Sequence, residues 1–248
     1  MTGYLSRNFK VKSKDKGSAP AAAPVELLSH EIKSEDLPKV ASGDSTGGET
    51  WFARTSLHEN KPIEGTASWE EFDAGLRQDH SVHEMEYTPD VQDAHKILDW
   101  ESELDSIQHT VGQWQEVQVE LREMCHHIPT PLNDRVFSVL VITAKHTSNN
   151  DKFKDDSKFL VVQIPVATKG MPGAKYNNKP KVTAGMYVSI ERGELVKDGR
   201  QVKWQMATAS DAGGVLPMWA QKMGVPGAVV KDVGLFVDWT AKRRQGKA

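Results

Sequence analysis

The second half of the chain alternates apolar and polar residues with the period of two that is typical of β-strands. Strands are predicted within residues 114–124, 135–146, 158–167, 181–196 and 201–210, for example WQEVQVELREM and QVKWQMATAS. Prolines, glycines and asparagines, which end strands, fill the connections between these runs. Because consecutive strands joined by such turns pair in opposite directions, the pattern predicts an antiparallel sheet.

The first half contains shorter elements. Residues 25–32 and 50–58 have the composition of strands, and Trp51 lies on one face of the second run. Ser68, with Glu71 three residues later, is the signature of a capping box, which predicts the start of a short amphipathic helix. Residues 83–88 are interpreted as a short strand. Residues 91–100 are interpreted as a helix because their apolar positions recur at helical spacing.

The chain ends with a predicted amphipathic helix. It is expected to begin at Pro217 and to be interrupted at residues 224–226, where glycine and proline occur together. Beyond the interruption the apolar residues share one face at helical spacing: Val229, Val230, Val233, Phe236, Val237 and Ala241. Such a helix can close the concave face of a curved sheet, either around a ligand cavity or on a packed core. Periodicity alone does not separate these two arrangements.

Composition and charge exclude several classes of protein. The 248 residues are 38% hydrophobic and 26% charged, with a formal charge of −3, so nucleic acid is not expected as a partner. The chain has one cysteine, Cys125, and its first thirty residues lack the apolar segment of a secretory signal, which predicts a cytoplasmic protein. Residues 1–24 and 245–248 are expected to be flexible tails. Any membrane contact is expected to be peripheral and transient, because no apolar run is long enough to span a bilayer.

Three motifs resemble the steroidogenic-acute-regulatory-related lipid-transfer (START) superfamily over residues 25–244. They are LDWE at residues 98–101, DRVF at residues 134–137 and ASDAGGVLPMWAQ at residues 209–221. In the third, Asp211, Gly214 and Pro217 match the passage from the last strand of that family into its lid helix. The strings WFARTSLHE, HEMEYTPDV and DRVFSVLV are more closely similar to a fungal START-like family of unknown function.

This resemblance implies an α+β helix-grip fold, in which a curved antiparallel sheet and a long C-terminal helix enclose an apolar cavity. It also implies a non-enzymatic carrier of a sterol, an acyl lipid or a similar hydrophobic ligand, expected to be monomeric. The chain departs from the family in two respects. Residues 1–24 contain no recognisable N-terminal helix, and residues 139–142 are aliphatic where several relatives have a buried arginine. A weakly polar ligand is therefore expected in preference to a charged head group.

Candidate site residues follow from the strand faces and the helical face. Those expected to line the cavity are Trp51, Phe137, Val139, Val141, Val161, Tyr187, Trp204, Met206, Val229, Val233 and Phe236. Arg135 and Glu120 are candidate polar anchors for the ligand, and Asp211 is expected to cap the backbone amides that follow it. A shift of one residue in any strand would exchange its two faces.

Other chemistry is weaker on sequence grounds. Cys125, His126 and His127 are adjacent, and His80 and His83 are three apart, so neither set has the spacing of a metal site, and no cofactor is expected. No nucleophile elbow or phosphate-binding loop is present in the sequence. Two alternatives remain open: an enzyme similar to the START-like aromatase/cyclase proteins, acting on a bound polyketide, and a regulatory or interaction module without a ligand.

Overall fold

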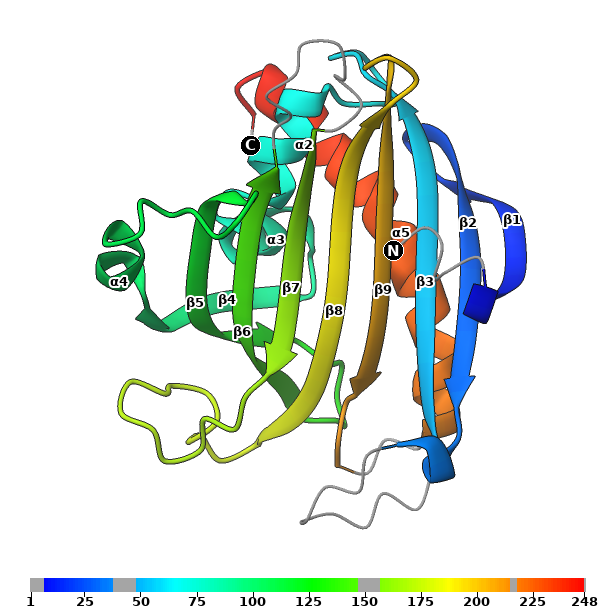
Figure 1. The fold of residues 1–248 in the computed structure, drawn as a ribbon. Helices are drawn as coiled ribbons and strands as arrows, with labels where there is room; N and C mark the ends of the chain where they lie inside the picture. The colour runs from blue at the N-terminus through cyan, green and yellow to red at the C-terminus, as the bar shows by residue number, and fades with distance from the viewer. Residues whose placement is uncertain (1–6, 38–47, 147–156, 215–217, 248) are drawn as a thin grey trace.

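The computed structural model describes residues 7–37, 48–146, 157–214 and 218–247, and they form one curved antiparallel sheet closed by a long helix (Figure 1). The strands are β1 (Lys10–Ser18), β2 (Ala21–Ile32), β3 (Glu49–Glu59), β4 (Val91–Asp99), β5 (Gln115–His126), β6 (Asp134–His146), β7 (Lys158–Pro165), β8 (Val182–Val196) and β9 (Gln201–Asp211). The helical elements are η1 (Ser34–Asp36), α2 (Trp69–Leu76), α3 (His80–Tyr87), α4 (Glu101–Asp105) and α5 (Met218–Arg244). The predicted helix-grip architecture is confirmed.

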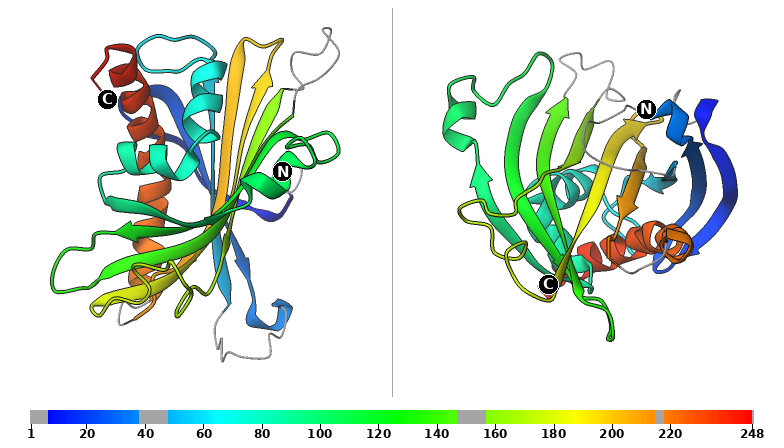
Figure 2. Two further views of the ribbon diagram at one scale, coloured as in Figure 1. Left: turned by 90° about the vertical axis from the view of Figure 1, so that its left-hand side faces the viewer. Right: turned by 90° about the horizontal axis from the view of Figure 1, so that it is seen from below.

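The strand order is β1-β2-β3-β9-β8-β7-β6-β5-β4, so β3 and β9 join the two halves of the chain. All neighbouring pairs are antiparallel, and a short parallel pairing links the starts of β6 and β8. The sheet curves around α5, while α2 and α3 cover one end of the same concave face (Figure 2). Two layers therefore enclose the main core, the sheet on one side and the helices on the other.

Aromatic side chains fill the end of the core beneath α2. The rings of Phe72, Trp204 and Phe236 lie 5.1 to 5.6 Å apart, centroid to centroid. They come from α2, β9 and α5, so a single cluster fixes both helices to the sheet. All three are at most 1% exposed, and burying rings of this size makes a large contribution to stability.

The predicted start of α2 is confirmed in atomic detail. The Ser68 hydroxyl accepts a hydrogen bond from the Glu71 amide at 3.3 Å, and the Glu71 carboxylate accepts one from the Ser68 amide at 2.7 Å. Arg244, in the last turn of α5, also binds Glu71, with 2.6 Å between Nε and Oε1. The cap of α2 therefore also holds the C-terminal end of α5.

The predicted strand at residues 83–88 and the predicted helix at residues 91–100 are both wrong, because these segments form α3 and β4. The buried residues of α3 are His80 and Ser81, which a search for apolar periodicity does not detect. In β4, the pairing with β5 is irregular between Val91 and Asp93. This bulge places Val91 and Ala94 on the same buried side although they are three residues apart, which imitates helical spacing.

The expected flexible tail is wrong from Lys10 onward, because residues 10–24 lie in β1 and the start of β2. The Ser18 hydroxyl donates to the Val230 carbonyl of α5 at 2.6 Å and accepts from the Gly234 amide at 2.8 Å. A Cβ at Gly234 would lie 2.4 Å from the Ala19 carbonyl oxygen, so the close approach of β1 to α5 requires a glycine there.

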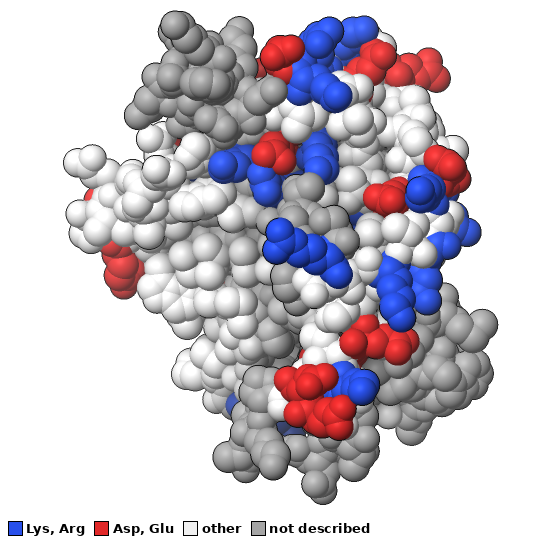
Figure 3. Space-filling view, turned by 45° about the vertical axis from the view of Figure 1, so that its right-hand side comes forward, with Lys and Arg blue, Asp and Glu red and all other residues white. Residues whose placement is uncertain are grey.

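Lysines in β1 mark it as the edge of the sheet. Lys10, Lys12, Lys14 and Lys16 are exposed along this strand, and charged side chains on an edge oppose pairing with other chains. Figure 3 shows Lys and Arg interspersed with Asp and Glu over this side of the molecule. Because positive and negative side chains are mixed, this side of the molecule does not form a binding surface of a single charge.

The expected interruption of the C-terminal helix is also wrong, because α5 continues through Pro226. The core face that follows explains its continuation, since Val229, Val233 and Phe236 are at most 4% exposed and hold the helix on the sheet. The predicted helix start at Pro217 lies outside the described residues. Among the described helices, none is both long and apolar enough to cross a membrane.

Candidate functional site

The candidate site is the interior enclosed by the concave face of the sheet, α3 and α5. Ten of the eleven residues predicted to line it face this interior, in or against the main core cluster: Phe137, Val139, Val141, Val161, Tyr187, Trp204, Met206, Val229, Val233 and Phe236. They come from β6, β7, β8, β9 and α5. The strand faces predicted for the second half of the chain therefore agree with the structure.

Trp51 is the exception, since it lies on the convex face of the sheet. It packs against a small separate cluster that contains Phe9, Leu28, Ala53 and Ala207. The interior face of β3 carries Arg54, Ser56 and His58 instead. The prediction assumed that the larger apolar side chain marks the interior, whereas on β3 the polar residues are the ones that face inward.

Exposure divides the interior into two parts. Val139, Val161, Val233 and Phe236 are 0% exposed, so these predicted lining residues are packed core and leave no surface for a ligand. Met85, Tyr87, Phe137, Tyr187 and Val225 pack against the same core but remain only partly buried. These partly buried residues come from α3, β6, β8 and α5.

A buried charged group stands at the border between the two parts. Nη2 of Arg54 donates to Oε1 of Glu191 at 3.0 Å, and Nε1 of Trp204 donates to the same oxygen at 2.7 Å. The Arg54 guanidinium lies over the Trp204 indole, with its central carbon 3.8 Å from the ring centroid. Met206 of β9 pairs with Arg54 of β3 on one side and with Glu191 of β8 on the other. These three residues therefore lie in one row across the sheet.

Arg54 retains unused hydrogen-bonding capacity. Its side chain is 2% exposed, yet Nε and Nη1 have no hydrogen-bond partner among the described residues. A buried donor without a partner costs roughly 1–3 kcal/mol, and the cost is larger on a charged group. An oxygen atom that accepted from either nitrogen would remove part of that cost, which makes Arg54 a candidate ligand anchor.

Two carboxyl groups face the same space from the helices. Burial raises the pKa of Asp232 on α5 to about 7, although the positive charge of Arg54 lowers it. Burial likewise raises the pKa of Glu84 on α3, and Glu191 adds to this effect. The side chains of Asp232 and Glu84 are half-buried.

Two tyrosines complete the polar part of the interior. Burial raises the pKa of Tyr87 and of Tyr187, and the nearby carboxylates Glu84 and Glu191 raise both further. Both phenols therefore stay protonated and can donate a hydrogen bond. Together with Arg54 and Asp232, they give a mostly apolar interior a few converging polar groups, the usual composition of a small-molecule site.

The predicted polar anchors have other roles. Arg135 is 2% exposed, and its Nε donates to the Ala212 carbonyl at 2.7 Å, while its guanidinium also contacts the Asn133 carbonyl. Glu120 binds Arg122 at 2.8 Å and lies opposite Val141, whereas Arg135 lies opposite His126, six residues further along β5. Arg135 therefore fixes the passage between β9 and α5 and forms no ion pair with Glu120.

The passage from β9 to α5 is built as its sequence suggests. The Asp211 carboxylate accepts from the Gly213 amide at 2.8 Å, which agrees with the predicted capping role. Gly213 and Gly214 have φ angles of 65° and 66°, in the left-handed region where glycine is preferred. Arg135 holds the carbonyl of Ala212 between them and Asp211, so the turn is supported from β6.

The histidines considered for metal binding are dispersed. Cys125 is buried, and its neighbour His126 on the opposite strand face contacts the Phe137 ring, with the centroids 5.2 Å apart. His127 pairs with Asp134 at 3.0 Å. Nδ1 of His80 lies 2.6 Å from the Leu76 carbonyl, which links α3 to the end of α2. These residues therefore do not converge on one point.

Comparison with known structures agrees with this geometry. The fold is that of START lipid-transfer domains: it matches the human StAR-related lipid transfer protein 5 with a TM-score of 0.58 and 12% identity, covering 99% of this chain and 92% of that one. Human STARD10 matches with a TM-score of 0.57 and 10% identity, covering 97% and 76%. By sequence, the chain belongs to the DUF3074 family, described as a protein of unknown function, whose model matches residues 51–240. Among curated protein sequences none matches.

Sequence reasoning missed the polar residues of the interior, namely Arg54, Glu84, Tyr87, Glu191 and Asp232. One signal was present, because Arg54, Ser56 and His58 alternate on one face of the predicted strand 50–58. The sequence alone does not predict that a strand face with arginine and histidine is buried, because its burial depends on the strands that pair with it. Glu84 lies on α3, in a segment that the sequence predicted as a strand, and Asp232 is a polar residue among the apolar positions of α5.

Proposed function

We propose that this protein binds an uncharged, mostly apolar ligand in its interior and that Arg54 holds an oxygen atom of that ligand. The unused donors of the buried Arg54 guanidinium carry this proposal. The fold supports it as well, since it matches lipid-transfer domains over nearly the whole chain.

The charges around Arg54 favour a neutral ligand. Glu191 already uses one nitrogen of the guanidinium, and Glu84 and Asp232 add two more carboxyl groups nearby. An anionic head group would meet these carboxylates, which is unfavourable in a medium of low dielectric constant. A hydroxyl group suits the site because it can accept from Arg54 and donate to Asp232 at once. Sterols and other apolar alcohols have this combination.

The first experiment asks what the protein carries. Protein purified from its expression host is extracted with organic solvent, and the extract is analysed by mass spectrometry. We expect an apolar molecule in a stoichiometric amount. If none is recovered, and the delipidated protein takes up neither fluorescent sterols nor acyl lipids, the proposal is wrong and an interior filled only by side chains is favoured.

The second experiment tests the anchor with an Arg54→Lys variant. Lysine retains the charge opposite Glu191 but lacks the Nε–H and Nη1–H donors. We expect Arg54→Lys to weaken binding of a hydroxyl-bearing sterol about tenfold and to leave binding of the matching hydrocarbon unchanged. Arg200→Lys, at an exposed turn, is the matched control. Equal loss for both probes would show that Arg54 supports the fold and does not contact the ligand.

Transfer between membranes is the role we propose for this binding, in the cytoplasm and by a monomer that contacts membranes transiently. The related human protein is named for lipid transfer, which supports the proposal. A fluorescence assay of movement between donor and acceptor vesicles measures it. Binding without any acceleration of transfer would restrict the function to storage or sensing.

A second candidate function is proton-transfer catalysis on a bound ligand. Asp232 favours it, because a carboxyl group with a pKa of about 7 in an apolar interior can act as an acid or a base near neutral pH. A polyketide of the kind that aromatase/cyclase proteins fold is the substrate to test. Conversion that Asp232→Asn abolishes, with binding retained, would establish the enzyme, and binding without conversion would exclude it.

A further inference from the structure

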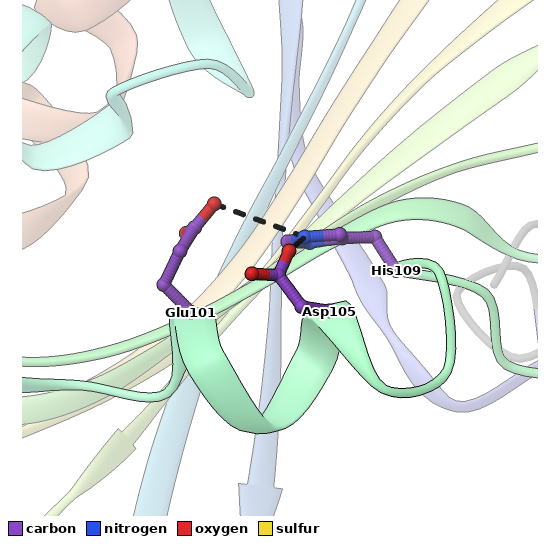
Figure 4. Close-up of side chains that lie close together, drawn as sticks. All are labelled: Glu101, Asp105 and His109. Atoms are coloured by element: carbon purple, nitrogen blue, oxygen red, sulfur yellow. Dashed lines mark hydrogen bonds and ion pairs between the residues drawn. The ribbon is translucent and has the colours of Figure 1, made fainter.

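A second cluster of functional groups lies outside the interior, on α4 and the loop that follows it. Glu101, Asp105 and His109 extend toward one another there (Figure 4). Nε2 of His109 lies 2.9 Å from Oδ1 of Asp105 and 3.8 Å from Oε1 of Glu101. Figure 1 shows α4 beside β4 and β5 at the edge of the sheet, far from α5, so this cluster is separate from the ligand interior.

The imidazole of His109 is fixed in the orientation that a metal ligand needs. Its Nδ1 donates to the Val117 carbonyl at 3.0 Å, and the Val117 amide donates to the His109 carbonyl at 2.9 Å. A backbone carbonyl and a carboxylate oxygen can only accept, so Nδ1 donates to Val117 and Nε2 donates to Asp105, and a metal ion would replace the proton on Nε2. Metal-binding histidines are held in the same way, by a hydrogen bond from the nitrogen that does not bind the metal.

The short helix that carries the two carboxylates is also held in place. Leu104, between them, is 9% exposed and packs with Val117 of β5 and Ala144 of β6. The His109 amide donates to the Leu104 carbonyl at 3.0 Å. All three side chains are therefore supported by β5, which reduces the ordering cost of binding an ion.

The charge of the cluster favours a cation. Neither Glu101 nor Asp105 pairs with a lysine or arginine within the described part of the chain, so His109 is their one partner there. Two carboxylates and one imidazole leave an excess of negative charge even when the imidazole is protonated. A divalent ion would neutralise both carboxylates and would take the place of the proton on Nε2.

We propose that Glu101, Asp105 and His109 form a binding site for a divalent transition-metal ion, with Zn²⁺ as the best match. Their ligand atoms all lie within 4.8 Å of one another. A tetrahedral Zn²⁺ with bonds of about 2.1 Å separates its ligands by roughly 3.4 Å, so small side-chain rotations complete the site. The imidazole ligand disfavours Mg²⁺ and Ca²⁺, which prefer oxygen alone.

Three protein ligands leave one position of the metal open. His109 also lines an open pocket of about 610 Å³, together with Arg77, Gln78, Asp79, Gln108, Thr110, Gln115, Glu116 and Gln118. Most of these side chains end in amide, hydroxyl or charged groups. The open position of the metal is available to water.

The test uses the full chain, freed of metal with a chelator and titrated with Zn²⁺ by calorimetry. We expect one equivalent to bind with a dissociation constant of about 10 µM or below. Co²⁺ in place of Zn²⁺ is expected to give visible absorption bands of a bound ion. Mg²⁺ and Ca²⁺ are expected to bind at least tenfold more weakly.

Asp105→Asn, Glu101→Gln and His109→Gln are each expected to reduce Zn²⁺ affinity at least tenfold. The first two residues are exposed, with side chains 71% and 64% accessible, so their replacement leaves the fold intact, which a thermal melt confirms. His127→Gln is the matched control, because His127 pairs with Asp134 but has no third ligand. Zn²⁺ affinity unchanged by Asp105→Asn and His109→Gln, or no saturable binding to the original chain, would overturn the proposal.

Discussion

Arg54 stacks on Trp204, and both residues donate a hydrogen bond to the same carboxylate oxygen of Glu191. The aromatic face and the carboxylate together compensate part of the charge that the sheet buries. This arrangement explains how β3 can carry an arginine toward a core that also contains Phe72 and Phe236. It also leads to the first of five predictions.

Arg54 and Glu191 should be strongly coupled. Arg54→Met removes the partner of a buried carboxylate, so we expect the free energy of unfolding to fall by roughly 3–5 kcal/mol. Adding Glu191→Gln restores part of this loss, because a neutral amide can still accept from Trp204. Urea denaturation of the two single variants and the double variant gives the coupling energy. Additive losses would mean that the pair is not coupled in solution.

Gly234 should tolerate no side chain. Gly234→Ala brings a methyl group to 2.4 Å from the Ala19 carbonyl oxygen, so β1 must shift, and we expect a loss of roughly 2–4 kcal/mol. Gly227→Ala, seven residues earlier in α5, meets nothing within 4 Å and should be neutral or stabilise the helix by up to about 1 kcal/mol. Thermal unfolding compares the two. Similar losses at both positions would contradict the docking of β1 on α5.

The free energy of unfolding should decrease as the pH is lowered, because His58 is buried in its neutral form. Burial and the neighbouring Arg54 lower its pKa in the folded protein from 6.5 to about 4. Below pH 6.5 the unfolded chain binds a proton at His58 that the folded protein does not bind. The contribution of His58 to the free energy of unfolding is therefore complete above pH 6.5 and is lost toward pH 4. We expect a loss of roughly 2 kcal/mol between pH 7 and pH 5. His58→Gln should reduce this dependence, and an unchanged slope would assign it to other groups.

Asp232 should act in the opposite direction. Its pKa is raised by burial from 3.8 to about 7, so the folded protein keeps a proton that the unfolded chain loses. The contribution of Asp232 to the free energy of unfolding is complete below pH 3.8 and is lost as the pH rises through 7. We expect Asp232→Asn to stabilise the protein by roughly 4 kcal/mol at pH 8 and to change little at pH 4. Denaturation at both pH values measures this, and destabilisation at pH 8 would show that the ionised carboxylate has a favourable partner.

Arg135 should control the flexibility of the turn before α5. Arg135→Met removes the donor to the Ala212 carbonyl, so we expect faster hydrogen exchange at residues 211–214 and a loss of roughly 1–3 kcal/mol in stability. Exchange in the β1–β2 pair, at the opposite edge of the sheet, is the internal control. Equal acceleration in both regions would indicate general unfolding instead of a local role.

Alternation and helix signals in the sequence were sufficient for much of the fold. The five strands of the second half, the capping box at Ser68 and the apolar face of α5 follow directly from local chemistry. The errors have physical causes. A bulge in β4 imitates helical spacing, and a lysine-rich edge strand has the composition of a tail, because it buries little. Pro226 stays within a helix because the buried face that follows it, with Val229, Val233 and Phe236, compensates for the missing hydrogen bond.

The site was predictable only in its apolar part. Tyr187, Phe137 and Met206 follow from strand alternation, but Arg54, Glu84 and Asp232 are polar residues whose partners lie far away in sequence. Arg54 is 137 positions from Glu191, and no local pattern indicates that distance. The Glu101, Asp105 and His109 cluster is hidden for a different reason, since two left-handed residues, Gln108 and His109, turn the imidazole back over α4.

Ser18 bonds to Val230 and Gly234 near the middle of α5, whereas Arg244 fixes the far end of the helix through Glu71. Because α5 is held near its middle and at its C-terminal end, only its N-terminal half can move away from the sheet. That half runs from Met218 to Gly234, about 24 Å at 1.5 Å per residue, and it carries Val225 and Val229 over the interior. Motion of α5 that opened the interior would then require the helix to bend near Gly234, with the largest displacement at Met218, while β1 holds Gly234 in place.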